Sequence, residues 1–113
     1  MPSLEAITRR RRRGRRAHAP VHPGEILSEE FLAPLELSAQ DLADGIHFPL
    51  RRVREIMRGA RPISAEVALR LARYFGTSEE FWMNLQVHHD LELERDRLGA
   101  RVRKEVAVLK RAS

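Results

Sequence analysis

The sequence predicts an all-α protein, and two observations support that fold class. Apolar residues recur three or four positions apart in successive segments, whereas no segment alternates strictly between apolar and polar residues as a half-buried strand does. Residues typical of helix starts and ends separate these segments, among them Ser38, Ser64, Gly59 and Gly76. At 113 residues with 42% apolar content, the chain is one domain long and can bury a modest core.

The first helix is expected to start at Pro23, because proline suits a first helical position. It should end before Pro34, which cannot continue the hydrogen-bond ladder. Its inward-facing residues are Ile26, Leu27 and Phe31.

The second helix is expected to open at Ser38, whose hydroxyl can form a capping box with Asp41 three residues later. Its apolar positions are Leu42, Ala43 and Ile46. The tripeptide Gly-Ile-His at 45–47 looks like the turn that follows this helix.

Residues 49–59 predict a third helix, with Pro49 at or near its first position and Gly59 at its end. At about 100° per residue, its apolar side holds Val53, Ile56 and Met57. The opposite arc holds Arg51, Arg54, Glu55 and Arg58, with Arg52 at the flank. Within residues 49–61, five arginines face one glutamate, a net charge of +4.

Two more helices are expected before residue 90. Ser64 caps residues 65–75, which Gly76 closes, and the inward residues are Val67, Leu69, Leu71, Ala72 and Phe75. Thr-Ser-Glu-Glu at 77–80 predicts a capping box for a helix through Phe81, Trp82 and Leu85. Trp82 fits either the core or a subunit interface, and the sequence does not separate the two.

Beyond Asp90 the pattern changes to a narrow apolar stripe, formed by Leu91, Leu98, Val102, Val106 and Leu109. A helix with one apolar stripe cannot bury itself, so it packs on its own domain or on a second subunit. We therefore divide the chain into a basic arm at residues 1–20, a domain at 21–90 and a C-terminal helical extension at 91–113.

The basic charge is concentrated in two places. Residues 1–16 hold seven arginines and Glu5, a net charge of +6, while residues 17–113 sum to −1. The run at 9–16 repels itself and has little apolar content, so we expect a disordered arm. Basic charge gathered on single elements is the footprint of a polyanion partner.

The second and third helices, joined by a tight turn, predict a helix-turn-helix whose second helix reads the DNA major groove. Arginine can grip guanine O6 and N7 with both ends of its planar fork. Glu55 could accept from a cytosine amino group or hold an arginine in place. A solvated basic face with local ion pairs is the alternative.

Several of these segments resemble HigA-type antitoxins within the Cro/C1-type helix-turn-helix class. They are "HPGEIL", "LSAQDLA", "ISAEVALRLARYFGTSEEFWMNLQ" and the following "DLE". The resemblance implies a five-helix, generally dimeric DNA-binding domain that represses its own operon and neutralises a HigB-type mRNA-cleaving toxin. It places the helix-turn-helix at residues 38–57. The predicted DNA-binding residues are Ser38, Pro49, Leu50, Arg51, Arg52, Arg54, Glu55 and Arg58.

The chain departs from the family pattern in the turn. The family commonly has glycine at the position of His47, followed by a small aliphatic residue and then Ser or Thr, where this chain has Phe48 and Pro49. His47 should adopt a left-handed backbone, which histidine tolerates better than most residues. Proline at 49 removes a hydroxyl that could cap the helix and contact a phosphate.

Two other functions compete with an antitoxin. A stand-alone transcriptional repressor would need the same helix-turn-helix, and a small basic reading frame immediately upstream would favour the antitoxin. RNA or ribosome binding through residues 9–16 is the third reading. No aromatic residue lies among those arginines to stack bases, and attraction to any DNA explains the run equally well.

An enzyme is the weakest reading. The chain has no cysteine and no glycine-rich phosphate loop. His88, His89 and Asp90 are the only cluster that resembles a metal site, but adjacent residues on a helix point about 100° apart. We expect no metal, no cofactor and no membrane span, and a cytoplasmic location.

Overall fold

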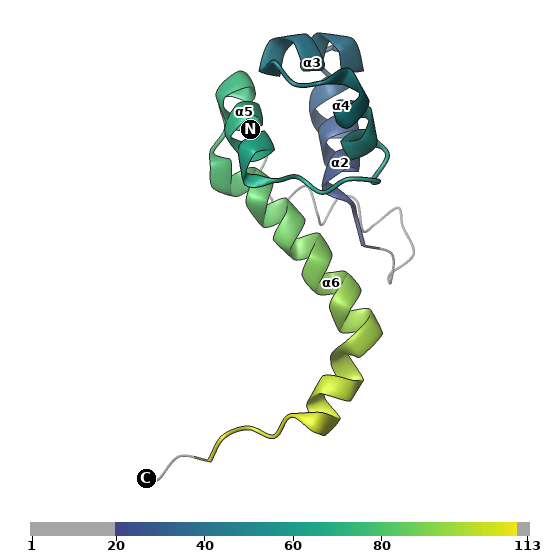
Figure 1. The fold of residues 1–113 in the computed structure, drawn as a ribbon, viewed down its shortest axis with the longest axis vertical. Coiled ribbons are helices and arrows are strands. Elements are labelled where there is room, and N and C mark those ends of the chain that lie inside the picture. Colours follow the sequence, from purple (N-terminus) through teal and green to yellow (C-terminus); the bar gives the residue numbers. More distant parts are fainter. Residues whose placement is uncertain (1–19, 111–113) are drawn as a thin grey trace.

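The structure is a computed structural model that describes residues 20–110 (Figure 1). The disordered arm predicted for residues 1–20 therefore lies outside the described residues, except for Pro20, as do residues 111–113. All regular elements of the described part are helices and none is a strand, as the sequence predicts. Its elements are α2 (Pro23–Ile26), the π-helix η1 (Leu27–Leu32), α3 (Ala39–Ile46), α4 (Leu50–Met57), α5 (Ala65–Phe75) and α6 (Glu79–Glu105).

The first helix begins at Pro23 and ends before Pro34, as predicted, but it is not one regular α-helix. The imidazole of His22 caps it, with Nδ1 accepting from the Gly24 N–H at 2.9 Å. From Leu27 onward the hydrogen bonds widen to five residues, and the Ala33 N–H bonds the Ser28 carbonyl at 2.9 Å. Such a π-helical stretch is rare.

The caps of α3 form as the sequence predicts. The Ser38 hydroxyl accepts from the Asp41 N–H at 3.0 Å, and the Asp41 carboxylate accepts from the Ser38 N–H at 2.9 Å. The helix continues through Ile46, so Gly45 and Ile46 are helical and the prediction of a turn at all three residues 45–47 was wrong. His47 alone turns the chain, at φ 54° and ψ 54°, in the predicted left-handed conformation.

The start of α6 differs from the predicted capping box. Ser78, not Thr77, caps the helix, and its hydroxyl accepts from the Phe81 N–H at 3.0 Å. The Thr77 hydroxyl instead accepts from Trp82 Nε1 at 2.7 Å. Because the indole N–H is otherwise buried, it needs this acceptor, and the neighbouring serine is left to cap the helix.

The core lies between α2, η1 and the four later helices, and its centre is aromatic. Trp82 and Leu71 are fully buried, and Phe31 lies 4.8 Å from the Trp82 ring, centroid to centroid. Trp82 therefore belongs to the core of a single chain. Leu69 was predicted to point inward and does not: 53% of it is exposed, on the outer side of α5.

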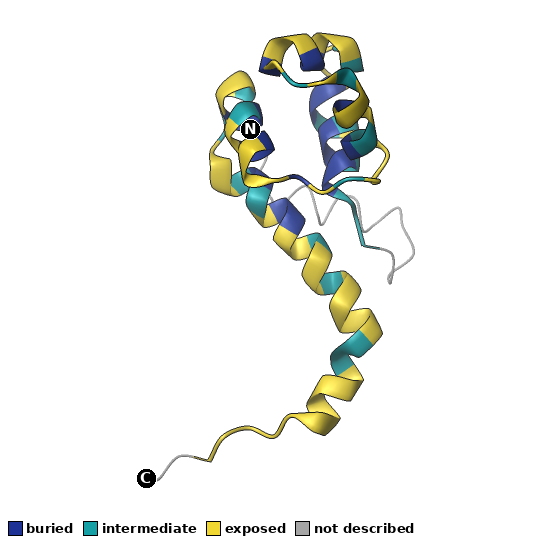
Figure 2. Ribbon diagram, in the orientation of Figure 1, coloured by how far each residue is buried: buried dark blue, intermediate teal, exposed yellow. Residues whose placement is uncertain are grey.

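Helix α6 starts in the core and then leaves it (Figures 1 and 2). It is one helix through Gly99, so the division predicted at residue 90 falls inside it. Beyond Asp90, Leu91 and Val102 remain 45% and 49% exposed, so this stripe does not pack on its own domain. The prediction that the helix reaches Leu109 was wrong, because the chain is non-helical from Val106 onward.

Candidate nucleic-acid interface

Helices α3 and α4 form a helix-turn-helix joined by residues 47–49. On α4, Val53 and Ile56 are 1% and 2% exposed, so the apolar side predicted from the sequence packs against the domain. Because this apolar side faces the core, the opposite side of α4 faces solvent. Pro49 precedes the first helical residue and supplies no side-chain cap, in line with its missing hydroxyl.

The predicted site residues lie together around this motif. Six are exposed and two, Leu50 and Glu55, are partly buried. The exposed residues are Ser38, Pro49, Arg51, Arg52, Arg54 and Arg58. Ser38 lies at the start of α3, where its oxygen accepts a backbone hydrogen bond, so its own proton is still available to a phosphate oxygen.

Glu55 lies between two arginines. Its Oε1 is 3.6 Å from Arg51 Nε, and its Oε2 is 3.5 Å from Arg61 Nη2. The Glu55 side chain is only 20% exposed, whereas that of Arg51 is 85% exposed. Of the two roles considered for Glu55, this geometry favours holding an arginine over accepting from a base.

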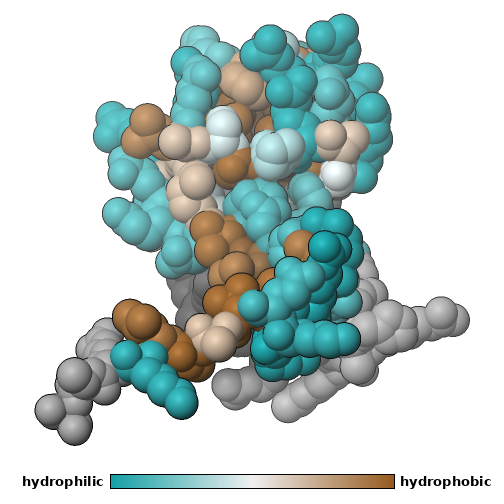
Figure 3. Space-filling model, turned by 60° about the horizontal axis from the view of Figure 1, so that its bottom comes forward, coloured by the Kyte–Doolittle hydropathy of each residue, from teal (hydrophilic) through white to brown (hydrophobic). Residues whose placement is uncertain are grey.

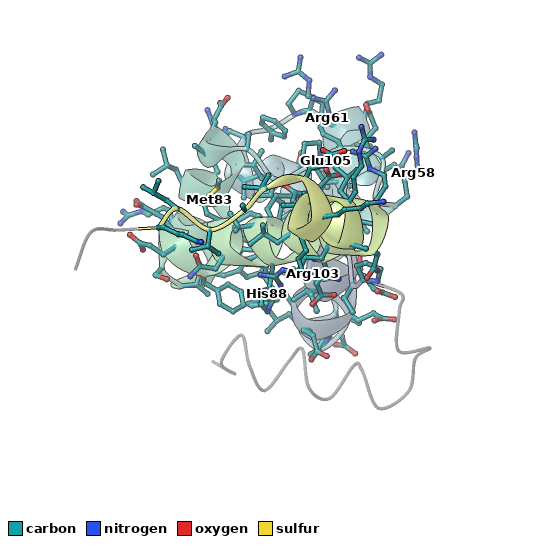
Figure 4. All side chains as sticks on the ribbon, turned by 90° about the horizontal axis from the view of Figure 1, so that it is seen from below. Arg58, Arg61, Met83, His88, Arg103 and Glu105 are labelled. Carbon is teal, nitrogen blue, oxygen red and sulfur yellow. The ribbon has the colours of Figure 1, made fainter. Side chains whose placement is uncertain are left out.

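Arg61 was missed as a site residue because it follows the helix-ending Gly59. Its loop is tied to α6, since the side-chain oxygen Oε1 of buried Gln86 accepts from the Ile63 N–H at 2.8 Å. In Figure 4, Arg58 and Arg61 lie on the upper right side of the view and His88 on the lower side. The loop thus adds a guanidinium to the basic surface that α4 presents.

Arg52, predicted at the flank of the basic face, packs over an aromatic ring. Its guanidinium carbon lies 5.8 Å from the centre of the Phe48 ring, within the range of a cation–π contact. Phe48 is the residue that departs from the small aliphatic residue of the family pattern. The aromatic ring in the turn therefore gives Arg52 a fixed support at the start of α4.

The histidines make a different arrangement from a metal site. The His22 and His89 rings meet edge to face, with centroids 4.8 Å apart, and Asp90 Oδ1 lies 3.5 Å from His89 Nδ1. Burial lowers the pKa of His22, and the neighbouring His89 lowers it further. Within residues 20–110, no group of three or more His, Asp or Glu side chains could hold a metal ion.

Comparison with known proteins shows the family to which this fold belongs. A family described as helix-turn-helix matches residues 29–82. Virulence-associated protein I of Dichelobacter nodosus is 46% identical over 80 residues, 71% of this chain and 74% of its own length. A HigA-family addiction module antidote protein from Coxiella burnetii is 46% identical, with a TM-score of 0.76, covering 80% of this chain and 98% of that one.

The chain belongs to the HigA-type helix-turn-helix family. A second HigA structure, that of the Pseudomonas aeruginosa antitoxin with the higBA promoter, is 42% identical, with a TM-score of 0.77. It covers 80% of this chain and 99% of its own. HigA-type proteins are regulators and not enzymes, which agrees with the expectation that this chain is not an enzyme. Among the described residues, no helix is long and apolar enough to cross a membrane.

Proposed function

We propose that this chain is a DNA-binding antitoxin, which represses its own operon and neutralises a HigB-type mRNA-cleaving toxin. The α4 surface carries the DNA-binding half of the proposal. It presents exposed arginines on a helix whose other side is buried in the core. The Pseudomonas aeruginosa relative, an antitoxin solved with promoter DNA, supports the same use of this fold.

In the proposed complex, α4 enters the major groove and Arg51 and Arg54 meet base edges. Pro49 and Leu50 lie at the entering end of the helix. Ser38, Arg52 and Arg58 meet the phosphates on either side. Glu55 holds Arg51 in place from the protein side.

The protein acts as a homodimer in this proposal, with residues 21–90 binding DNA and residues 91–113 joining the two copies. Figure 3 shows apolar side chains gathered on the part of the chain that comes forward, down to the C-terminal segment. The exposed apolar residues of this surface are Leu91, Val102, Val106, Val108 and Leu109. A surface of this kind on a monomer marks an interaction site.

A toxin partner and a cytoplasmic location complete the proposal. The alternative, a stand-alone repressor, would have the same α4 surface and no toxin. A small basic reading frame immediately upstream of this gene is expected for the antitoxin, and co-expression with its product separates the two. The antitoxin proposal predicts that the two proteins purify together and that this chain restores growth to cells that express the upstream product; neither would occur for a stand-alone repressor.

DNA binding is tested with a duplex that covers the promoter of this chain's own operon and a random duplex of equal length. Arg51→Ala and Arg54→Ala should each lower promoter affinity by about 1–3 kcal/mol, the value of one good bidentate base contact. Arg73→Ala removes the same charge from an exposed position on α5, outside the proposed dimer interface, and should leave promoter affinity unchanged. Equal affinity for all three variants and the parent would remove α4 from the interface.

A further inference from the structure

Arg70 of α5 reaches the C-terminal end of α3. Its Nη1 donates to the Ile46 carbonyl at 2.9 Å and to the His47 carbonyl at 3.3 Å. The other side of the same guanidinium binds the Glu66 carboxylate, with Nε and Nη2 both 3.1 Å from Oε2. One arginine therefore joins its own helix to the turn of the helix-turn-helix.

The two carbonyls that Arg70 binds need a donor. The last carbonyls of any helix lack partners within the helix, and the C-terminal end carries partial negative charge. Helix α3 has no basic residue in its own last turn. The cation that satisfies this end comes instead from a residue 24 positions away in the chain.

The turn that Arg70 binds is also strained. His47 is a non-glycine residue with a left-handed backbone, a conformation that costs on the order of 1 kcal/mol and persists only where the surroundings hold it. Tyr74, one helical turn after Arg70, holds the same region: a Cβ atom on Gly45 would lie 2.3 Å from the Tyr74 ring. Arg70 and Tyr74 of α5 thus both pack against the C-terminal end of α3.

This turn sets the direction of α4. Only residues 47–49 separate the two helices, so a rotation at His47 carries directly into the angle at which α4 leaves the turn. Reading a base requires the contacting side chain to be placed within about 0.5 Å and 10–20°. We propose that Arg70 is a positioning residue for DNA recognition, acting through the Ile46 and His47 carbonyls to fix the angle of α4.

The inference rests on the proposed function of α4, and Arg73 provides a matched control. Arg73 lies on the same helix and lines the same open groove, a cavity of about 490 Å³, together with Arg70 and Tyr74. Arg73 is exposed, and its side chain makes no hydrogen bond or ion pair among the described residues. Removing Arg73 removes the same charge from the same groove and leaves the turn untouched.

The experiment measures affinity for the promoter duplex and for the random duplex over a series of salt concentrations. Arg70→Ala should lower promoter affinity by about 10- to 100-fold, the value of charge-assisted hydrogen bonds, and leave random DNA and the salt slope nearly unchanged. Arg70→Lys should not restore the preference for the promoter, because one ammonium group cannot bind Glu66 and both carbonyls together. Arg73→Ala should leave the promoter-to-random ratio at the parent's value.

A phosphate contact would give the opposite result. If Arg70→Ala weakened both duplexes equally and flattened the slope of log affinity against log salt by about 0.9, Arg70 would be a phosphate ligand and the inference would be overturned. An unchanged promoter-to-random ratio would overturn it as well.

Amide hydrogen exchange in the protein without DNA separates failure of this inference from failure of the proposed function. Arg70→Ala should speed exchange at His47 and Phe48, whose N–H groups bond the Asp44 and Ala43 carbonyls, while buried Leu71 stays protected. Unchanged exchange at the turn would overturn the positioning role even if the parent showed no preference for the promoter. Glu66→Gln is the second variant, for the case in which Arg70→Ala does not fold. It weakens the hold on the Arg70 guanidinium without removing it, and it should change both readouts in the same direction by a smaller amount.

Discussion

Gly24 of α2 lies directly against the carbonyl oxygen of Ile56 in α4: a Cβ atom at position 24 would lie 1.7 Å from that oxygen. The contact is between two backbones, so no side-chain rotation can relieve it. Helix α4, the second helix of the helix-turn-helix, therefore packs directly against α2 on its core-facing side. This close approach, and not a turn, is what requires glycine at position 24.

Gly24→Ala should destabilise the protein by at least about 3 kcal/mol, the upper end of ordinary overpacking costs. Gly99→Ala is the matched control on an exposed stretch of α6, where the new methyl would meet only an arginine side-chain nitrogen at 3.5 Å. That substitution should stabilise the protein by about 0.5–1 kcal/mol, because alanine favours a helix interior. Urea unfolding measures both, and a Gly24→Ala variant as stable as the parent would show that α2 and α4 can separate freely.

Glu55 is predicted to act through Arg51. Glu55→Gln and Arg51→Ala should each reduce promoter affinity, and the double variant should lose much less than the sum of the two, because Glu55 has no further role once Arg51 is gone. Fluorescence anisotropy on the promoter duplex gives the four affinities of this cycle. Additive losses would instead indicate that Glu55 contacts a base or acts through Arg61 alone.

Acid should destabilise the protein through His22. Its Nδ1 accepts the Gly24 N–H, so only an imidazole with a free Nδ1 lone pair can cap α2. Burial and His89 lower the pKa of His22 in the folded state. The stabilisation that the neutral His22 provides is therefore fully present above the ordinary histidine pKa of about 6.5. It is lost as the pH falls below that value, because the unfolded chain then binds more protons than the folded one. The charged and titratable groups around His22 are His89, Asp90, Glu25, Glu29 and Arg58.

Urea unfolding at pH 7.5 and pH 5 measures this loss. His22→Asn keeps a capping oxygen and cannot titrate, so the difference between the two pH values should shrink. His88→Ala removes an exposed histidine from α6 and should leave that difference at the parent's value. If the difference in stability between pH 7.5 and pH 5 persists in His22→Asn, another titratable group causes it.

The protein is predicted to be a dimer joined by the exposed end of α6. At about 100° per residue, Val87, Leu91, Leu98 and Val102 fall on one side of this helix and Leu93 on the other. Val102→Glu should give a monomer in light scattering at micromolar concentration, and Leu93→Glu should remain a dimer. Both residues are about half exposed in the single chain, 49% and 45%, so neither substitution should unfold it. A monomeric parent would refute the prediction.

The basic arm should add affinity without adding sequence information. Its seven arginines form a block with nothing apolar to dock, so they can neutralise phosphates but hardly read bases. With roughly two to four engaged per subunit, deleting residues 1–20 should flatten the slope of log affinity against log salt by about 2–4 per subunit. Salt titrations of both proteins on both duplexes test this. A large fall in the promoter-to-random ratio would show that the arm reads a groove.

The predictions from sequence succeeded where the determining contact is local. Ser38 with Asp41 and Ser64 with Val67 are each three positions apart, and periodicity alone placed Val53 and Ile56 in the core. The HigA-type segments also identified the family correctly.

The predictions failed where a distant residue decides. Thr77 lost its capping role because the Trp82 indole takes its hydroxyl. Leu69 is a separate case: at about 100° per residue it lies nearly opposite Val67, Leu71 and Phe75, so helical spacing itself puts this apolar residue outside. Arg70 gave no signal at all, since the carbonyls that it binds belong to residues 23 and 24 positions away.

Helix α6 runs from Glu79 to Glu105 without a break, so in the proposed dimer it would fix both the distance and the relative rotation between the two DNA-binding domains. Each residue of a helix advances about 1.5 Å and rotates about 100°. One residue inserted between Asp90 and Leu91 would turn the DNA-binding domain of each copy by that angle relative to the dimer interface, so the two α4 helices would no longer face the same side of the duplex. Seven inserted residues, close to two full turns, would nearly restore the aim while moving the domains roughly 10 Å along the helix. In the proposed dimer, the accepted operator spacing would thus depend on the residue count of α6 as well as on the side chains of α4.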